Sequence, residues 1–103
     1  YELVEKVAAK VGIENPIPKE TVVCFGDYVG PGYSQPTDSM IEAVRMLAET
    51  EAILMDPVYT GKAIAGLIDL VRKGFFDPDE NILFVHTGGS PALHVYADCF
   101  LGD

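Results

Sequence analysis

The sequence predicts an α/β fold, in which a parallel sheet is flanked by helices. Segments rich in β-branched and aromatic residues alternate along the chain with amphipathic segments of helical period. The apolar run at residues 82–85 does not alternate with polar residues, which is typical of a strand buried on both faces of a sheet. A piece of 103 residues with only two or three strands cannot easily cover both faces of such a sheet by itself. We therefore expect the 103 residues to be cut from a longer chain that supplies the rest of the sheet.

The first predicted helix covers residues 1–11, where apolar residues recur at the spacing of one helical face. Gly12 follows in the position that favours a left-handed helix end. Residues 21–25 have the β-branched and aromatic content of a buried strand. Residues 26–36 hold three glycines and two prolines, so we expect a loop there.

Two further helices are predicted in the middle of the chain. Ser39 and Glu42 have the spacing of a capping box, which predicts a helix from Ser39 to about residue 50. Residues 56–62 contain a proline and a glycine and are expected to form a turn. An amphipathic helix follows this turn and is expected to end just before Gly74.

The last predicted elements are a strand at residues 82–85 and a helix after it. The intervening turn contains Thr87, Gly88 and Gly89. Ser90 is the expected N-cap of the final helix, with Pro91 at its first position.

Composition excludes several classes of protein. Sixteen acidic residues against seven basic ones give a formal charge of -9, and such a surface repels nucleic acids and anionic lipids. The apolar stretches are far shorter than the ~20 residues of a membrane span, and no signal peptide opens the chain. Cys24 and Cys99 stand alone in apolar segments and are expected to be reduced, buried thiols. These features favour a soluble, cytoplasmic protein without a metal site.

Ligands of open α/β sheets bind beyond the carboxyl ends of the strands, where three segments of this chain should meet. They are the loop at residues 26–36, the turn at 56–62 and the turn at 87–89. The last could bind a phosphate through backbone N–H groups, or it could be an ordinary strand-to-helix turn. Lys62 lacks the rest of a phosphate-binding loop and is expected to be solvated or paired with a carboxylate. The spacing of His86 and His94 is not that of a metal pair, so structural roles are expected for both.

Four stretches considered together are more specific than any one of them. Tyr33-Ser34-Gln35-Pro36 and residues 41–45, 56–63 and 86–93 closely resemble the carboxyl-terminal third of the D-cysteine desulfhydrase and 1-aminocyclopropane-1-carboxylate deaminase family. These enzymes use pyridoxal 5'-phosphate and have the tryptophan synthase β-subunit-like fold, also called fold type II. The resemblance implies that residues 1–103 form the carboxyl-terminal part of the larger, cofactor-binding domain.

The resemblance also implies roles for individual residues. Tyr33 and Tyr59 match the two active-site tyrosines beside the cofactor and the substrate. Thr87 matches the residue whose hydroxyl faces the pyridine nitrogen in the desulfhydrase branch, and Gly88 and Gly89 match the turn that approaches the ring. Thr60 matches a position that holds a glutamate in the deaminase branch.

Threonine instead of glutamate favours one reaction of the family. A neutral hydroxyl makes the ring a weaker electron sink than a carboxylate does, which suits loss of a good leaving group better than opening of a cyclopropane. The resemblance therefore implies β-elimination from D-cysteine or a related amino acid to pyruvate, ammonia and sulfide. The deaminase and L-cysteate sulfo-lyase activities stay open. An alternative of another class is a non-catalytic, acidic module that binds a small anion at residues 87–91.

The resemblance places the Schiff-base lysine and the phosphate-binding loop upstream of residue 1. Lys62 does not match that lysine's motif, so we expect the isolated chain to be inactive. The expected partners are the amino-acid substrate, the missing amino-terminal part of the same polypeptide and, in the complete enzyme, a second copy in a homodimer.

Overall fold

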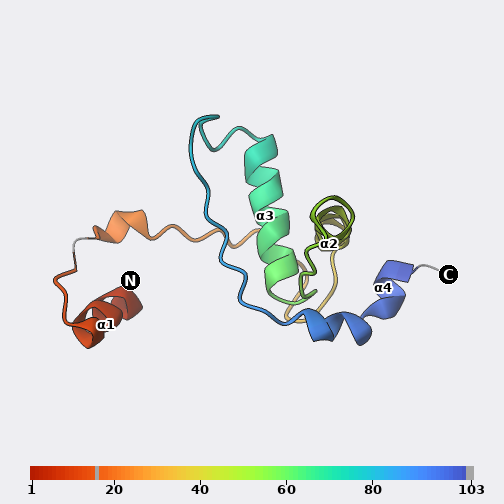
Figure 1. The fold of residues 1–103 in the computed structure, drawn as a ribbon, viewed down its shortest axis with the longest axis horizontal. Coiled ribbons are helices and arrows are strands. Elements are labelled where there is room, and N and C mark those ends of the chain that lie inside the picture. Colours follow the sequence, from red (N-terminus) through yellow and green to blue (C-terminus); the bar gives the residue numbers. More distant parts are fainter. Residues whose placement is uncertain (16, 102–103) are drawn as a thin grey trace.

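The computed structural model describes residues 1–15 and 17–101, and the helices there are joined by extended segments and turns (Figure 1). The elements in chain order are α1 (Glu2–Val11), η1 (Lys19–Thr21), α2 (Asp38–Glu51), α3 (Thr60–Arg72), η2 (Ser90–His94) and α4 (Ala97–Leu101). The chain measures 54 × 31 × 27 Å, with a radius of gyration of 16.1 Å. A compact domain of this length has a radius of about 13 Å, so the chain is extended.

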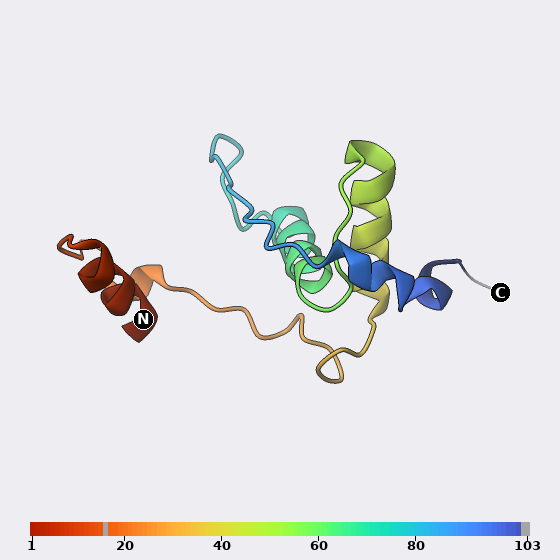
Figure 2. The ribbon, with the colours of Figure 1, turned by 60° about the horizontal axis from the view of Figure 1, so that its bottom comes forward.

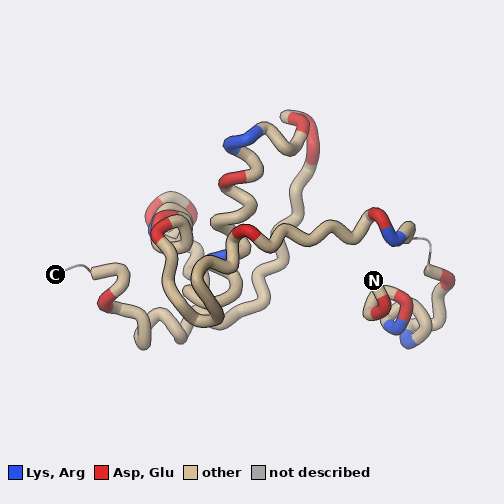
Figure 3. Tube along the Cα trace, turned by 180° about the vertical axis from the view of Figure 1, so that it is seen from behind, with Lys and Arg blue, Asp and Glu red and all other residues tan. Residues whose placement is uncertain are grey.

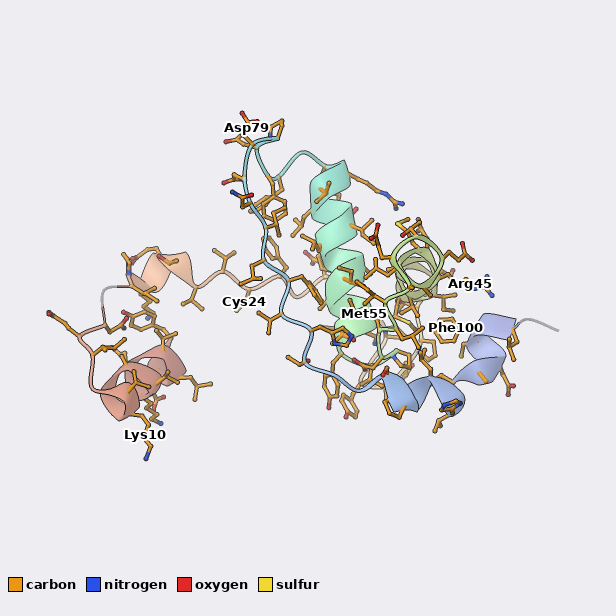
Figure 4. All side chains as sticks on the ribbon, in the orientation of Figure 1. Lys10, Cys24, Arg45, Met55, Asp79 and Phe100 are labelled. Carbon is orange, nitrogen blue, oxygen red and sulfur yellow. The ribbon has the colours of Figure 1, made fainter. Side chains whose placement is uncertain are left out.

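The packed centre of the molecule is the pair α2 and α3, which lie side by side in both ribbon views (Figure 2). Small and flexible apolar side chains fill the space between them, namely Met40, Ala43, Val44, Met55, Ile64 and Ala65. Figure 4 shows Met55 beside these helices and Phe100 close to α2. Arg45 of α2 donates a hydrogen bond to the carbonyl oxygen of Phe100, which ties α4 to the same centre.

Helix α1 forms as predicted but lies apart from this centre, at the far end of an extended segment (Figures 1 and 2). Gly12 ends it in the left-handed conformation, with φ of 73°. Its apolar face, which carries Leu3, Val7 and Val11, is exposed. The hydroxyl of Tyr1 donates to the carbonyl oxygen of Ile17 at 2.5 Å, which ties the start of α1 to the segment that follows it.

The predicted parallel sheet is absent from the described residues, which contain no strand. Strands were expected at residues 21–25 and 82–85, but Thr21 ends η1, and residues 22–25 and 82–85 are extended with no neighbouring strand. Their side chains stand in solvent, with Val23 62% and Leu83 88% exposed. A strand forms only where a second backbone accepts and donates its hydrogen bonds, so composition alone was not sufficient here. The same exposure corrects the prediction that Cys24 is buried; Cys24 is an exposed free thiol, as Figure 4 shows, and Cys99 is a half-buried one.

Two predicted helix starts were wrong. Helix α2 begins at Asp38, and the hydroxyl of Thr37, not Ser39, accepts a hydrogen bond from the backbone N–H of Met40 at 3.3 Å. Thr37 has the extended backbone that an N-cap requires, whereas Ser39 is already helical. The final predicted helix is divided into the short 3₁₀-helix η2 and α4, and Gly89 in the left-handed conformation precedes it.

Charge is distributed along the whole chain. Figure 3 shows the acidic residues spread along the helices and the segments between them instead of in one cluster. Among the described residues, no three metal-binding side chains are placed to hold a metal ion. Nor does any described helix combine the length and apolar character that crossing a membrane requires.

Candidate active site

The structure brings together the two tyrosines that the sequence singles out. Tyr33 lies in the loop before α2, and Tyr59 lies immediately before α3. Their hydroxyl oxygens are 2.6 Å apart, so one phenol donates a hydrogen bond to the other. The ring centres are 5.9 Å apart, and the ring planes are inclined by 58°. The side chains are 72% and 62% exposed, so a small molecule can reach the hydroxyl pair.

The pairing changes the proton affinity of Tyr59. The hydrogen bond with Tyr33 raises the pKa of Tyr59 above its ordinary value of 10.0, and partial burial and the negative charge of Asp56 raise it further. The phenol of Tyr59 is therefore protonated at neutral pH. In this form it can act only as a proton donor, and the raised pKa makes it a weaker acid than an ordinary tyrosine.

The turn that carries Tyr59 is built on the carboxylate of Asp56, which is 2% exposed. One carboxylate oxygen accepts from the backbone N–H groups of Val58 and Tyr59 at 2.8 and 2.7 Å. The other accepts from the N–H and the hydroxyl of Thr60 at 2.7 and 2.6 Å. Burial alone would raise the pKa of Asp56, but these four hydrogen bonds outweigh it and hold the pKa below 3.8. Asp56 therefore caps α3 as an anion and fixes the backbone of Tyr59.

Thr60 uses its hydroxyl inside this turn. It donates to Asp56 and also accepts from the backbone N–H of Asp56 at 2.9 Å. Its donor is therefore occupied, and the residue is only 3% exposed. The Thr60 hydroxyl is thus bonded to Asp56 within the turn, which leaves Thr87 as the hydroxyl with an open side.

The turn at residues 87–89 lies against the same aspartate. A Cβ added to Gly89 would lie 3.0 Å from Cβ of Asp56, so only glycine allows this approach. Gly88 has φ of +95°, and a Cβ there would meet nothing within 4 Å. Thr87 is exposed. The turn therefore presents its Thr87–Gly88 side to open space while Gly89 packs on Asp56.

His86 holds this turn in place through both ring nitrogens. Its Nδ1 accepts from the backbone N–H of Gly88 at 3.0 Å, so Nε2 carries the proton and donates to the carbonyl oxygen of Leu54 at 2.9 Å. This agrees with the structural role predicted for His86. Sequence reasoning missed Asp56, although an aspartate before a helix start is a known signal for a capping side chain.

The sequence predicts that Lys62 is solvated or paired with a carboxylate, but the structure shows neither. It is 8% exposed, and its ammonium donates to the backbone carbonyl oxygens of Val29 and Gly32. The prediction was wrong because a lysine near a helix start is usually at the surface, whereas here the glycine-rich loop folds over it.

The tyrosine pair borders an open cavity of about 530 Å³ between the loop and α3. Most of its lining is apolar, including Phe25, Val29, Val58 and Leu67. Thr87, Gly88 and Gly89 do not line this cavity. Asp56 connects the two parts of the site, because its carboxylate organises the Tyr59 turn and its side chain contacts Gly89.

Comparisons with known proteins show what the chain is similar to. The sequence is 42% identical over 96 residues to 1-aminocyclopropane-1-carboxylate deaminase of Rhizobium radiobacter, covering 93% of this chain and 28% of that protein. It is 57% identical over 72 residues to D-cysteine desulfhydrase of Salmonella newport, covering 70% of this chain and 22% of that protein. A solved structure described as an ACC deaminase homologue superposes with a TM-score of 0.76 and 36% identity, covering 95% of this chain and 28% of the other.

The chain thus spans about a quarter of the length of the relatives it matches. The model of one sequence family, described as pyridoxal-phosphate dependent enzyme, matches residues 2–88, which is most of the chain. The chain belongs to the pyridoxal-phosphate dependent enzyme family.

Proposed function

We propose that this chain is the carboxyl-terminal part of a pyridoxal-phosphate dependent lyase that eliminates the β-substituent of D-cysteine or a related amino acid. The products are pyruvate, ammonia and sulfide. The observation that carries the proposal is the exposed, hydrogen-bonded pair Tyr33 and Tyr59 at the edge of a cavity. Both tyrosines match active-site residues in the family that the sequence resembles.

The residues of the turn at 87–89 fit the cofactor. The Thr87 hydroxyl is exposed and has no hydrogen-bond partner among the described residues, so it is free to donate to an aromatic nitrogen. The open space at Gly88 allows a flat ring to approach the backbone. When bound, pyridoxal phosphate supplies an electron sink for the bonds at the α-carbon of the substrate. Thr87 and Gly88 would hold its ring, and Gly89 would support the turn.

The tyrosine pair would supply a proton to the leaving group. Tyr59 carries its proton at neutral pH, as a phenol with a pKa above 10.0 must. Its Oη can donate to the departing sulfur, while the Tyr33 hydroxyl passes a proton to the Tyr59 oxygen across the 2.6 Å contact. A positioned acid of this kind typically contributes ~10²- to 10⁴-fold in rate.

Thr60 supports elimination over cyclopropane opening. Its neutral hydroxyl, occupied by Asp56, adds no carboxylate beside the cofactor nitrogen. The relatives named deaminase and desulfhydrase are both similar to this chain, so identity does not choose between them. The choice of substrate rests on the chemistry at Thr60 and Thr87.

Product analysis of the complete enzyme that contains this segment tests the reaction. Incubated separately with D-cysteine, 1-aminocyclopropane-1-carboxylate and L-cysteate, it should release sulfide and little 2-oxobutyrate or sulfite. Tyr59→Phe should lower sulfide release ~10²- to 10⁴-fold while the cofactor stays bound. Tyr1→Phe, which changes a phenol near α1, is the matched control and should have no effect. Efficient release of 2-oxobutyrate without sulfide would overturn the proposal.

A second experiment tests whether the 103-residue chain can bind the cofactor covalently and react without the rest of the enzyme. The ammonium of Lys62 is buried and bonded to two carbonyl oxygens, so it is a poor nucleophile towards an aldehyde. The 103-residue chain, mixed with pyridoxal phosphate and reduced with borohydride, should carry no pyridoxyl adduct at Lys62 and should release no sulfide. An adduct at Lys62, located by mass spectrometry, would contradict this expectation.

A further inference from the structure

Lys62 is a buried cation whose partners are backbone oxygens. Its Nζ lies 2.6 Å from the carbonyl oxygen of Val29 and 3.2 Å from that of Gly32. None of the ion pairs among the described residues includes Lys62. Removing an ammonium from water is costly, so a lysine is retained in such a place only where its hydrogen bonds replace hydration.

Both carbonyl groups belong to the glycine-rich loop that presents Tyr33. Gly32 directly precedes Tyr33, so the second hydrogen bond fixes the backbone one residue from the phenol. A Cβ built on Gly30 would lie 3.9 Å from Nζ of Lys62, which shows how closely the loop wraps the ammonium. The loop has little regular structure of its own, and its position depends on such contacts.

Lys62 and Tyr59 reach the loop from the same place. They are three positions apart at the start of α3, so their side chains lie on one side of the helix. The start of α3 therefore holds the loop at two points, through the ammonium at two carbonyl oxygens and through the phenol at the Tyr33 hydroxyl.

We propose that Lys62 is a positioning residue that sets the Tyr33 hydroxyl against that of Tyr59 by holding the carbonyl groups of Val29 and Gly32. The role in turnover rests on the proposed function, whereas the role in geometry does not. Lys62 itself touches no reacting atom in this scheme. Its ammonium neither exchanges protons nor bonds to the cofactor.

The geometry is tested in the 103-residue chain labelled at the tyrosine ring carbon that bears the hydroxyl. The pKa of Tyr59 is read by nuclear magnetic resonance, and helix content by circular dichroism. In Lys62→Met the loop is released, so the pKa of Tyr59 should fall toward 10.0 while α2 and α3 remain folded. Lys62→Arg keeps cationic donors and should restore the raised pKa. Lys10→Met removes an exposed lysine of α1 and should leave the pKa unchanged.

The role in turnover is tested in the complete enzyme with the same variants. A displaced catalytic group costs ~10²-fold in rate, so Lys62→Met should lower kcat by about that factor with little change in KM. Lys62→Arg should recover most of the loss. If sulfide is not produced at all but the pKa of Tyr59 still falls in Lys62→Met, the proposed reaction fails and the positioning role stands.

Two results would overturn the proposal. The first is a folded Lys62→Met chain in which the pKa of Tyr59 equals that of the unsubstituted chain. The second is loss of helix content in Lys62→Met, Lys62→Gln and Lys62→Arg alike, because that would assign Lys62 to folding instead of to the placement of Tyr33.

Discussion

Removal of the Asp56 carboxylate is the sharpest test of how the site is built. In Asp56→Ala, three backbone N–H groups and one hydroxyl lose their acceptor. The N–H groups of Val58 and Tyr59 can be hydrated after a small movement, because these residues are partly exposed. The N–H and hydroxyl of Thr60 are buried and have no such replacement.

The size of the effect follows from these four bonds. Loss of a capping side chain costs ~0.5–2 kcal/mol. Leaving a buried donor unsatisfied costs ~1–3 kcal/mol. Because the two contributions overlap at Thr60, we expect Asp56→Ala to lower the free energy of unfolding by about 2–4 kcal/mol. Urea unfolding followed by circular dichroism measures it.

Asp79→Ala is the matched control for this substitution. Asp79 lies at the tip of the loop after α3 (Figure 4) and is exposed. Its loss should change stability by less than about 0.5 kcal/mol. If Asp56→Ala and Asp79→Ala destabilise the chain equally, the carboxylate of Asp56 does not hold the turn and does not fix the backbone of Tyr59.

The contribution of Asp56 also depends on pH. Its pKa in the folded chain lies below the ordinary value of 3.8, so its stabilisation is fully present above that value. The stabilisation is lost as the pH falls through the lower, folded pKa. The difference in unfolding free energy between the unsubstituted chain and Asp56→Asn should therefore be constant near neutral pH and should shrink below pH 3.8. A difference that grows on acidification would refute the assignment.

Three other predictions concern separate parts of the molecule. Gly61→Ala should lower the free energy of unfolding by ~1–3 kcal/mol, because the added Cβ would lie 2.5 Å from a backbone oxygen of the preceding turn. Gly26→Ala, whose added Cβ would meet nothing within 4 Å, should leave it nearly unchanged in the same urea titration. In the complete enzyme, Thr87→Val should weaken cofactor binding by ~1–3 kcal/mol and Thr87→Ser should not, as a fluorescence titration with pyridoxal phosphate would measure. In the native chain, iodoacetamide should alkylate the exposed Cys24 before the half-buried Cys99, which mass spectrometry of the peptides would establish.

Local patterns in the sequence predicted the helices well. The period of apolar residues gave α1, α2 and α3 to within a few residues, and Gly12 and Gly74 have the left-handed backbone expected after helices. Helix propensity and capping act within a few residues, so they can be read from neighbours in the sequence. The cap of α2 was predicted two positions too late, at Ser39, because the hydroxyl of Thr37 can accept the same hydrogen bond.

The sheet could not be predicted in the same way. The segments around Val23 and Leu83 have the composition of strands. Strand formation also requires hydrogen bonds with another segment, and the described residues supply no such partner. The site was predicted in part. The convergence of Tyr33 and Tyr59 followed from the family resemblance, and the four bonds of Asp56 are local ones that an aspartate before a helix start could have indicated. The burial of Lys62 depends instead on how a loop folds over α3. Such contacts join residues up to thirty-three positions apart and have no local signal.

The segments that build the site are distinct from those that lack partners. Tyr33 and Tyr59 are held by contacts with Lys62 and Asp56, all within this chain. The exposed apolar side chains of residues 22–25 and 82–85 take no part in those hydrogen bonds, although Phe25 lines the cavity beside the pair. A sheet could therefore form along these extended segments without breaking a hydrogen bond of the tyrosine pair or of the Asp56 turn. The 103-residue chain therefore tests how Lys62 and Asp56 hold the pair, whereas the pKa of Tyr59 in the complete enzyme needs its own measurement, because further burial there would raise it.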